Sequence, residues 1–437
     1  MQRESNTLEV QAGMRVCIIG AGPSGLAAIK NLQEEGITQL TVFEKNNQIG
    51  GNWVFDESNT HSSVYETTHI ISSKRWSQFE DFPMPDHYPD YPSHHLILEY
   101  FKNYAKHFAL ERYIRFNTTV TKITLTPERK WHVTYENSEG THQSEFDYLL
   151  VANGHHWDPN LPQYPGHFNG QILHSHQYKK AASFSGKKVL IVGGGNSACD
   201  VAVEIARVSP FTCISMRRGY HIFPKFVFGK ATDDAVAKTL WMPSWLRQKF
   251  FAIVIRILQG RYAKYNLPKP DCDPLEIHPT VNSELLYSIR HGKVKPRAGI
   301  SHFSEDKVFF TDGTHEAFDT IIFATGYKIS FPFFNKEFID FSDSTKVPLY
   351  RKMMHAEYDN LYFIGLCQPQ GCIWPLADFQ SKVVARILAG KLKRPEHIQE
   401  KIDEEMNRPH YRFKAHTRHA VEVDYHRFRR ELMEMLA

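Results

Sequence analysis

Apolar and polar positions follow the same order in two stretches of the chain. In the first, the apolar run 16–19 is followed by the glycine-rich sequence GAGPSG at 20–25, after which apolar residues recur at helical spacing. This pattern predicts a strand, a tight turn and a helix whose N-terminus faces the turn. Gly20 permits the turn, Gly22 lets a pyrophosphate approach the backbone, and Gly25 lets the helix pack on the strand.

A second apolar run, 40–43, predicts the next strand, and it ends at Glu44, which lies 24 positions after Gly20 (44 minus 20). An acidic residue at this distance is typical of the ribose-binding position of a dinucleotide unit. A carboxylate accepts hydrogen bonds from a ribose diol and repels a 2′-phosphate. The first turn is therefore expected to bind an adenosine with a free 2′-hydroxyl group.

The same order recurs at 188–206, where an apolar run leads into GGGNSA at 193–198 and a second helical pattern. Ala198 replaces the third glycine, which is allowed because the packing point needs only a small side chain. The strand expected at 212–215 leads to Arg217 and Arg218, where the first stretch has its acid. Two guanidinium groups suit a 2′-phosphate, so the second turn is expected to bind NADPH rather than NADH; the alternative is a solvated arginine pair.

Composition agrees with a globular protein of more than one domain. The chain has 437 residues, 42% hydrophobic and 23% charged, and a formal net charge of +4. No basic stripe is present, so we expect no nucleic-acid partner. The six cysteines form no C-x-x-C pair, which disfavours a disulfide reductase, and the polar N-terminus has no secretory signal, so a cytoplasmic location is expected. The 24 histidines show no chelating spacing, and no metal site is expected.

The most hydrophobic stretch, FFAIVIRIL at 250–258, is too short to span a membrane and contains Arg256. Trp241 and Trp245 precede it. A helix resting on a membrane surface or capping a substrate channel is one interpretation of this region. We favour the other, a packed core helix, because amphipathic segments are more often buried.

A third pattern lies between the two glycine turns. Phe168, Gly170, His174 and Tyr178 fit F-x-G-x-x-x-H-x-x-x-[YF], the fingerprint of the flavin-containing monooxygenases. With both glycine motifs, the chain from Val16 to about Leu388 resembles that family. Tyr178 is informative, since the related Baeyer-Villiger enzymes usually have tryptophan there.

The resemblance implies an α/β fold with two Rossmann-like, doubly wound dinucleotide-binding domains, the NADPH domain inserted into the FAD domain. The FAD domain is expected at 1–165 and, with C-terminal helices, at 319–437, and the NADPH domain at 166–318. His174 and His176 are expected to fix the linker between domains rather than to act as acid or base. Four further segments resemble family strands or NADP-domain sequence: 146–154, 278–282, 323–327 and 359–365.

The resemblance also implies the residues that bind each cofactor. For FAD these are Gly20, Gly22, Pro23, Ser24, Gly25, Glu44, Lys45, Gly51, Trp53, His61, Ser72 and Gln380. For NADP they are Gly193, Gly195, Asn196, Ser197, Ala198, Arg217 and Arg218.

In the scheme of the resembled family, NADPH reduces FAD, and O2 adds to the reduced ring as a C4a-hydroperoxide that oxygenates a small soft nucleophile, an amine nitrogen or a sulfide sulfur. The cofactor supplies the hard chemistry, so no catalytic side chain is assigned. The alternatives are Baeyer-Villiger oxygenation of ketones and a non-enzymatic flavin- or NADP-binding regulator. Family members are often dimers, so a homodimer is an expectation.

One position departs from the resembled family. Amine and sulfur oxygenators commonly have an asparagine near the flavin, and Ile71 occupies that position in the segment 67–74. An aliphatic side chain cannot donate the hydrogen bond of an amide, a loss of about 1–3 kcal/mol for a buried contact. The hypothesis is that the oxygenated intermediate is shorter-lived, or is stabilised differently, than in typical amine oxygenators.

Overall fold

The computed structural model describes residues 13–58, 61–274, 278–410 and 420–437. The chain forms two compact units. The first unit contains Met1–Phe55, Lys74–Asp158 and Lys328–Ala437, and the second contains Asp56–Ser73 and Pro159–Tyr327. The chain passes between them near β8 (Asp158–Pro159) and β21 (Tyr327–Lys328).

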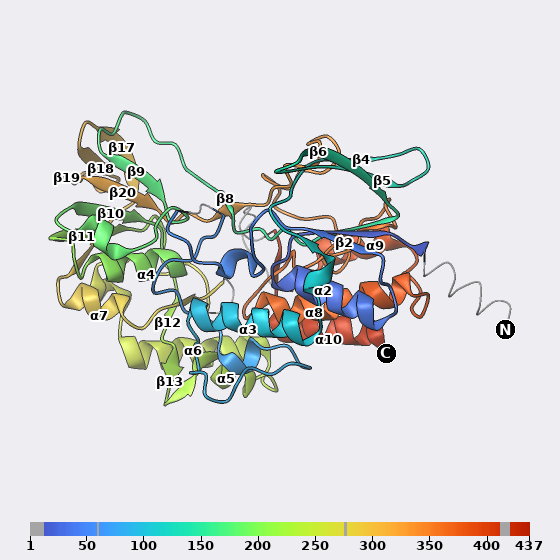
Figure 1. Ribbon diagram of the computed structural model, residues 1–437. Helices are drawn as coiled ribbons and strands as arrows, with labels where there is room; N and C mark the ends of the chain where they lie inside the picture. The colour runs from blue at the N-terminus through green and yellow to red at the C-terminus, as the bar shows by residue number, and fades with distance from the viewer. Residues whose placement is uncertain (1–12, 59–60, 275–277, 411–419) are drawn as a thin grey trace. The chain divides into compact units, whose positions relative to one another are not determined.

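A parallel five-stranded sheet organises the first unit (Figure 1). Its strands, in spatial order, are β22 (Leu361–Phe363), β7 (Tyr148–Val151), β1 (Val16–Ile19), β2 (Leu40–Phe43) and β3 (Ile114–Arg115). An antiparallel sheet follows from β4 (Thr119–Leu125), β5 (Trp131–Asn137) and β6 (Gly140–Phe146). The remaining strands, β23 (Gln368–Pro369) and β24 (Glu422–Val423), pair with each other.

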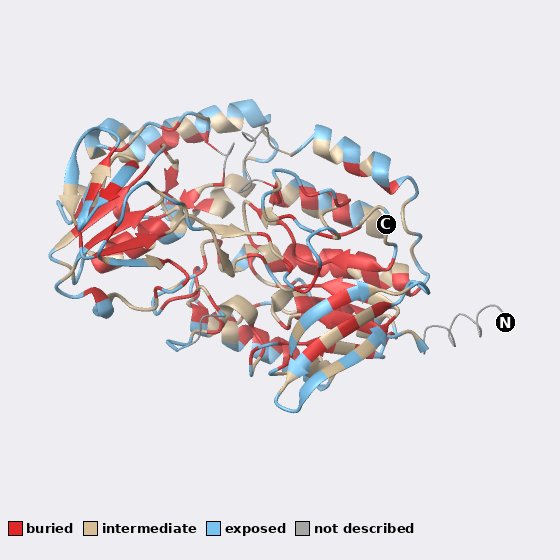
Figure 2. Cartoon of the chain, turned by 90° about the horizontal axis from the view of Figure 1, so that it is seen from above, coloured by how far each residue is buried: buried red, intermediate tan, exposed pale blue. Residues whose placement is uncertain are grey.

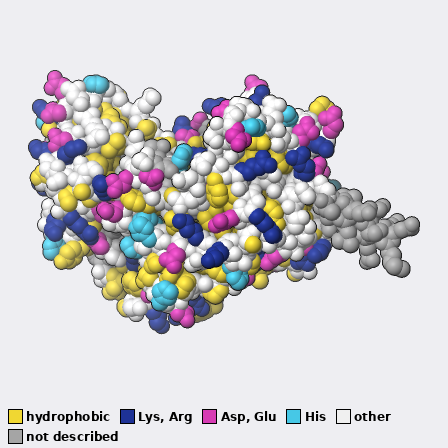
Figure 3. All heavy atoms as spheres, viewed as in Figure 1, with side chains coloured by type: hydrophobic (Ala, Val, Ile, Leu, Met, Phe, Trp, Pro, Cys, Tyr) yellow, Lys and Arg dark blue, Asp and Glu magenta, His cyan; other side chains and the backbone are white. Residues whose placement is uncertain are grey.

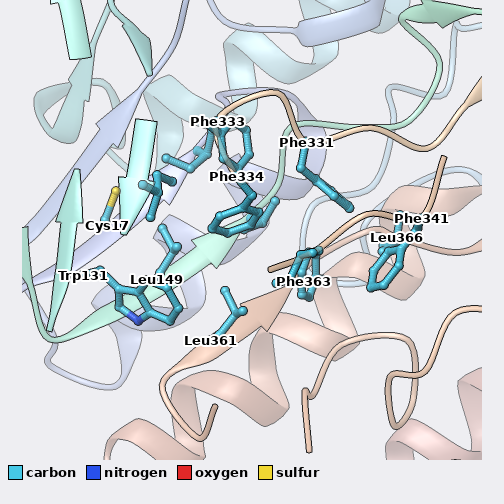
Figure 4. Close-up of a cluster of buried hydrophobic side chains, with 14 of the residues drawn as sticks. Cys17, Trp131, Leu149, Phe331, Phe333, Phe334, Phe341, Leu361, Phe363 and Leu366 are labelled. Carbon is cyan, nitrogen blue, oxygen red and sulfur yellow. The ribbon is translucent and has the colours of Figure 1, made fainter. Parts of the chain in front are cut away.

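The first unit's sheet is apolar on both faces because other elements of the unit cover each face. Alternate residues such as Cys17, Ile19 and Leu149 meet Trp131 of β5 and a group of phenylalanines in one buried cluster (Figure 4). On the helical side, α2 contacts β1 and α8, and α8 contacts α10. The helices and short 3-10 turns are α2 (Pro23–Glu34), η1 (Gly51–Trp53), η2 (Lys74–Trp76), α3 (His94–His107), η3 (Glu111–Tyr113), α8 (Ile373–Leu388), α9 (Ile398–Asn407) and α10 (Tyr425–Leu436).

The second unit repeats this plan with its own parallel sheet. The spatial order is β16 (Val294–Arg297), β11 (Phe211–Ser215), β10 (Lys188–Val192), β20 (Thr320–Phe323) and β9 (Gln171–His174). Its other strands are β12 (Ile222–Phe223) with β15 (Thr280–Val281), β13 (Phe226–Val227) with β14 (Lys230–Ala231), and the antiparallel set β17 (Ile300–Ser304), β18 (Lys307–Phe310) and β19 (His315–Ala317). Its helices and turns are η4 (Ala181–Phe184), α4 (Asn196–Ile205), α5 (Thr232–Ala237), α6 (Ser244–Gln259), η5 (Tyr262–Tyr265) and α7 (Leu285–Arg290).

Successive side chains of β10 point to opposite faces of the sheet, so its single apolar run contributes to two hydrophobic clusters. Val189 and Ile191 pack with residues of α4 and α7, whereas Leu190 and Val192 pack with the sheet β17–β19. In Figure 2 the central strands are therefore buried, while the edges and outer helix faces are exposed. The two predicted Rossmann-like sheets are confirmed.

The course of the chain differs from the sequence-based boundaries in two places. The strand at 320–323 was expected to return the chain to the first unit, but it pairs with β10 and β9 inside the second unit's sheet. Residues 56–73, expected in the first unit, belong to the second. The assignment of FAD to one unit and NADPH to the other stays a proposal.

Candidate active site

The first glycine turn joins β1 to α2 and leaves no room for side chains. Gly20 has a φ of +100°, and a Cβ there would lie 2.7 Å from the carbonyl oxygen of Ala152. A Cβ on Gly25 would lie 2.0 Å from the carbonyl oxygen of Gly20. Both positions therefore require glycine.

Two other backbone segments lie against this turn. Gly51 of η1 has a φ of +53°, and its Cβ would lie 3.0 Å from the Cα of Gly22. Gly365, after β22, approaches Ser24, so that a Cβ on Gly365 would lie 2.1 Å from the Ser24 Oγ. Pro23 is the first residue of α2. A backbone surface bare of side chains at a helix N-terminus fits the pyrophosphate of FAD.

Glu44 follows β2 and its carboxylate lies against the first glycine turn. One carboxylate oxygen accepts a hydrogen bond from the Ala21 N–H at 2.7 Å, and the other accepts one from the Asn46 N–H at 2.8 Å. Burial raises the pKa of the Glu44 carboxyl, and these two donors act in the opposite direction. Each oxygen has a second lone pair, so the carboxylate can also accept a hydrogen bond from a ribose hydroxyl.

Aromatic side chains lie beside the turn in the first unit. The Trp53 ring meets the Trp374 ring edge-on with centroids 5.5 Å apart, and Trp374 also meets Phe101 at 5.3 Å. The exposed Lys45 places its Nζ 5.4 Å from the ring centroid of Trp157. Trp53 is thus anchored by aromatic packing, and its contact with FAD stays a prediction.

Gln380 is fully buried on α8 and its amide is engaged with the backbone. Its Oε1 accepts a hydrogen bond from the Gly365 N–H at 2.9 Å, and its Nε2 donates to the Arg351 carbonyl at 2.9 Å. Gln380 therefore holds the backbone that approaches Ser24. The expected direct contact of Gln380 with the flavin stays a prediction.

The second glycine turn repeats the geometry of the first. Gly193 has a φ of +139°, and its Cβ would lie 2.4 Å from the carbonyl oxygen of Ala324. The existing Cβ of Ala198 would lie 3.4 Å from a Cβ on Gly193. Gly195 caps α4, and Ser197 is exposed on its first turn. The turn fits the pyrophosphate of NADPH as the first fits that of FAD.

The segment 278–282 is hydrogen-bonded to this second turn. The Thr280 Oγ1 donates to the Gly194 carbonyl at 2.9 Å, and the Val281 N–H donates to the Asn196 Oδ1 at 2.6 Å. The Asn282 Nδ2 donates to Asp200 at 2.6 Å. Asn196, predicted as a cofactor-binding residue, therefore also fixes this segment. Sequence reasoning identified the segment by resemblance but missed the contact, since no local pattern encodes it.

Arg217 and Arg218 follow β11, which lies next to β10 as β2 lies next to β1. Arg217 is exposed, and the Arg218 guanidinium lies 5.6 Å from the ring centroid of Tyr220. Among the residues that the structure describes, neither forms an ion pair with an acidic side chain. Two cations without an acidic partner at this position fit the 2′-phosphate of NADPH.

The fingerprint residues lie inside the second unit. The Tyr178 hydroxyl donates to Glu204 at 2.8 Å, and the rings of His174 and His176 lie 5.1 and 5.9 Å from that of Tyr327. Burial, with a smaller contribution from His176, lowers the pKa of His174 to about 4. His174 is neutral near pH 7. The role expected for His174 and His176, fixing the linker between the domains, stays a prediction.

Residues 56–73 are held to the second unit by polar contacts. The Tyr65 hydroxyl donates to Asp200 at 3.0 Å, Thr67 bonds Glu204, and Lys179 donates to the Ser62 carbonyl at 2.6 Å. This segment carries three residues expected near the flavin: His61, Ile71 and Ser72. Their proposed contact with FAD remains a prediction, made now for residues of the second unit.

Across the described ranges, no group of three or more acidic, histidine or cysteine side chains could hold a metal ion. The six cysteines, all of them in described parts of the chain, form no disulfide. None of the helices in the described ranges is both long enough and apolar enough to cross a bilayer.

Comparison with known proteins identifies the family. Residues 13–437 match the model of the flavin-binding monooxygenase-like family. Flavin-containing monooxygenase 5 of Oryctolagus cuniculus is 34% identical over 97% of this chain and 83% of its own length. Dimethylaniline monooxygenase [N-oxide-forming] 2 of Rattus norvegicus is 35% identical over 87% of this chain and 74% of its own length.

Solved structures share the fold at lower identity. The S-allyl-L-cysteine S-oxygenase from Allium sativum has a TM-score of 0.71 at 22% identity, covering 96% of this chain and 88% of its own. The open crystal structure of cyclohexanone monooxygenase has a TM-score of 0.73 at 17% identity, covering 97% of each chain. With two glycine turns that fit FAD and NADPH, the chain belongs to the flavin-binding monooxygenase-like family and is an NADPH-dependent flavin monooxygenase.

Proposed function

We propose that this monooxygenase transfers one oxygen atom of O2 to an amine nitrogen or a sulfide sulfur of a small molecule, with FAD bound to the first unit and NADPH to the second. The reaction consumes one NADPH, one proton and one O2, and it releases NADP+, water and the oxygenated product. The names of two similar proteins, an N-oxide-forming dimethylaniline monooxygenase and an S-oxygenase, support this substrate class.

The proposal rests on one observation: the side chains beside the two turns carry opposite charges, although the turns themselves are similar. Glu44 lies at the first turn with its carboxylate buried, and Arg217 and Arg218 follow the matching strand of the second. FAD, when bound, accepts hydride from NADPH and reacts with O2. The chain's own groups bind and orient the two nucleotides: the turns approach the pyrophosphates, Glu44 accepts from a ribose, and the arginines hold the 2′-phosphate.

A panel of amines, sulfides and ketones, scored by oxygenated product, tests the substrate class. We expect N-oxides or sulfoxides with NADPH under air. Esters or lactones from ketones as the main products would establish the Baeyer-Villiger alternative instead. Negligible NADPH consumption by flavin-loaded protein would favour the regulator. NADPH consumption alone cannot score the panel, because an uncoupled enzyme releases hydrogen peroxide.

Ile71 is proposed to lower the coupling of NADPH consumption to product. It is half-buried at the end of the segment 56–73, where the family's asparagine would offer an amide. In an Ile71→Asn variant the added donor, worth about 1–3 kcal/mol if buried and paired, should raise the ratio of product to NADPH consumed. An Ile71→Val variant controls for side-chain volume. Equal peroxide release from all three proteins would contradict this role.

Two further expectations belong to the same proposal. The cysteines, none of which is disulfide-bonded, support a reducing, cytoplasmic location, which fractionation of cells that express the protein would test. A homodimer is expected from the family, and sedimentation analysis of the holoenzyme would measure it.

A further inference from the structure

An ion-pair network in the first unit holds the loop 349–354, which lies before β22 in the chain. The Arg351 Nη1 donates to a carboxylate oxygen of Glu405 on α9 and to one of Glu431 on α10, each at 2.7 Å. The other Glu405 oxygen accepts a hydrogen bond from the Arg351 N–H at 3.1 Å. Glu405 therefore holds both the side chain and the backbone of Arg351, and Glu431 joins the loop to α10.

This network differs from ion pairs at the surface of the protein in its burial. Figure 3 shows acidic and basic side chains scattered over the visible face, where solvent screens ion pairs and each contributes little to stability. The side chains of Arg351, Glu405 and Glu431 are only 18%, 23% and 11% exposed. Burial acts to raise the pKa of the Glu431 carboxyl. The hydrogen bond and charge of His410, the charge of Arg351 and the hydrogen bond from Arg427 outweigh burial and lower this pKa to about 2. Glu431 is therefore ionised near pH 7, and removal of its buried partner is costly.

The backbone that this network holds is unfavourable for the residues present. Arg351 and Lys352 have φ values of +50° and +53°, in the left-handed region where a Cβ is crowded and which glycine adopts readily. Within the described part of the chain, they are the only two adjacent residues other than glycine in that region. Such a conformation persists only where its surroundings hold it. Backbone hydrogen bonds between Tyr350 and Met354, at 2.9 and 3.0 Å, close the loop, and the ion pairs of Arg351 hold its tip.

Two hydrogen bonds connect this loop to the first glycine turn. The Arg351 carbonyl accepts from the Gln380 Nε2, and the Gln380 Oε1 accepts from the Gly365 N–H, both at 2.9 Å. Gln380 is fully buried, so solvent cannot supply another partner if the Arg351 carbonyl turns away. Gly365 lies so close to Ser24 that a Cβ on Gly365 would be 2.1 Å from the Ser24 Oγ. The orientation of the Arg351 carbonyl therefore sets the position of the backbone beside the N-terminus of α2.

We propose that Arg351 is a positioning residue for FAD. Its ion pairs hold the loop 349–354 in the left-handed conformation, and the loop's carbonyl keeps Gln380 and Gly365 in place at the N-terminus of α2, where the pyrophosphate is expected. The inference rests on the proposed binding of FAD to the first unit. Because FAD binding requires the backbone conformation and not the guanidinium itself, a residue that adopts this conformation without ion pairs should replace Arg351.

Two substitutions at this one position test the inference. Arg351→Ala and Arg351→Gly both remove the ion pairs, so both variants should melt at a lower temperature than the wild type. Only glycine adopts a φ of +50° without steric cost, so only R351A should lose the orientation of the carbonyl. We expect the Kd for FAD to rise about tenfold in R351A, equivalent to about 1.4 kcal/mol, and to stay within about twofold of the wild type in R351G. Flavin fluorescence released on dilution of each holoenzyme measures the Kd, and a thermal melt measures Tm.

Arg427→Ala is the matched control. The Arg427 Nε donates to the same Glu431 carboxylate at 2.9 Å, but Arg427 belongs to α10 and not to the loop. This variant should melt at a lower temperature and bind FAD as the wild type does. The Kd for NADPH, which is assigned to the second unit, should be unchanged in all three variants. Equal Kd values for FAD in R351A and R351G, whether raised or unchanged, would overturn the inference and leave the proposed function standing. A wild type that binds no FAD would overturn both.

Discussion

The two glycine turns share one backbone geometry and differ in the charge beside it, which is the basis for assigning a different nucleotide to each. In each, the strand before the turn lies between two others. One of them is followed by charged residues, and the other is followed by an alanine, Ala152 or Ala324, whose carbonyl oxygen lies beside the first glycine. The backbone is therefore repeated and does not distinguish the ligands. The distinction lies in Glu44 on one side and Arg217 with Arg218 on the other, so charge at one position is expected to decide which nucleotide binds.

Substitution of the third glycine of the first turn, Gly25, should have the largest effect on stability and on FAD binding. A Gly25→Ala substitution places a methyl group 2.0 Å from the carbonyl oxygen of Gly20, and overpacking of this kind costs about 3 kcal/mol or more. We expect purified G25A to lack FAD and to melt at lower temperature. Absorbance of the flavin and a thermal melt would measure both.

Ala198→Gly is the reciprocal change in the second turn. Ala198 already has a Cβ that fits, so this variant should keep its NADPH affinity and lose only about 1 kcal/mol of stability from helix α4. If G25A keeps its flavin while A198G loses NADPH binding, the two turns are not packed as the distances indicate.

Substitution of Arg217 and Arg218 should have the next largest effect, on the affinity for NADPH. Replacing Arg217 and Arg218 by alanine removes two charge-assisted contacts to the expected 2′-phosphate, about 3 kcal/mol in total, which corresponds to roughly a hundredfold rise in the Kd for NADPH. The Kd for NADH should change little, because NADH has no such phosphate. Titration of the flavin-loaded protein with each nucleotide gives both constants, with Lys293→Ala as a control for general loss of charge. A wild type that binds NADH as tightly as NADPH would refute the assignment.

Glu44→Gln should have a smaller effect at the other turn. The amide keeps one oxygen acceptor but loses the charge and the acceptor at the second atom, so FAD affinity should fall about tenfold, or about 1.4 kcal/mol. The preference for NADPH over NADH should stay unchanged, which makes this variant and the arginine variant controls for each other. FAD release monitored by fluorescence would measure the change. An altered nucleotide preference in E44Q would contradict the separation of the two sites.

Local patterns in the sequence predicted the two turns because strand, turn and helix follow one another within about thirty residues. The positions of Glu44 and of Arg217 with Arg218 followed from the same local spacing. Residues 56–73 could not be placed in this way, because the Tyr65–Asp200 hydrogen bond joins residues 135 positions apart. The same holds for β20, whose apolar sequence fits either sheet. It also holds for α6, where the expected packed core helix is only half right: Phe251 and Ile255 are buried, but Ile253 and Ile257 are exposed.

Each unit has a buried histidine whose pKa is lowered by burial, His155 in the first and His174 in the second, and the stability of the protein at low pH should report on His174. Burial lowers the pKa of His174 from 6.5 to about 4, so between these values the unfolded chain binds a proton that the folded chain does not. Stability from this residue is complete above pH 6.5 and is lost as the pH falls toward 4, up to about 3 kcal/mol. Burial raises the pKa of Asp200 and of Glu204 in the same unit. On acidification these two carboxyls stabilise the folded state, which makes the net loss of stability smaller.

A His174→Asn variant keeps an acceptor for the backbone N–H of His176, and it should lose less stability between pH 6.5 and 4 than the wild type. Denaturant unfolding at each pH would measure the free energy of unfolding. His291→Asn, a change at an exposed histidine, is the control and should follow the wild type. Parallel curves for the wild type and H174N would show that His174 is not the group that couples folding of this unit to pH.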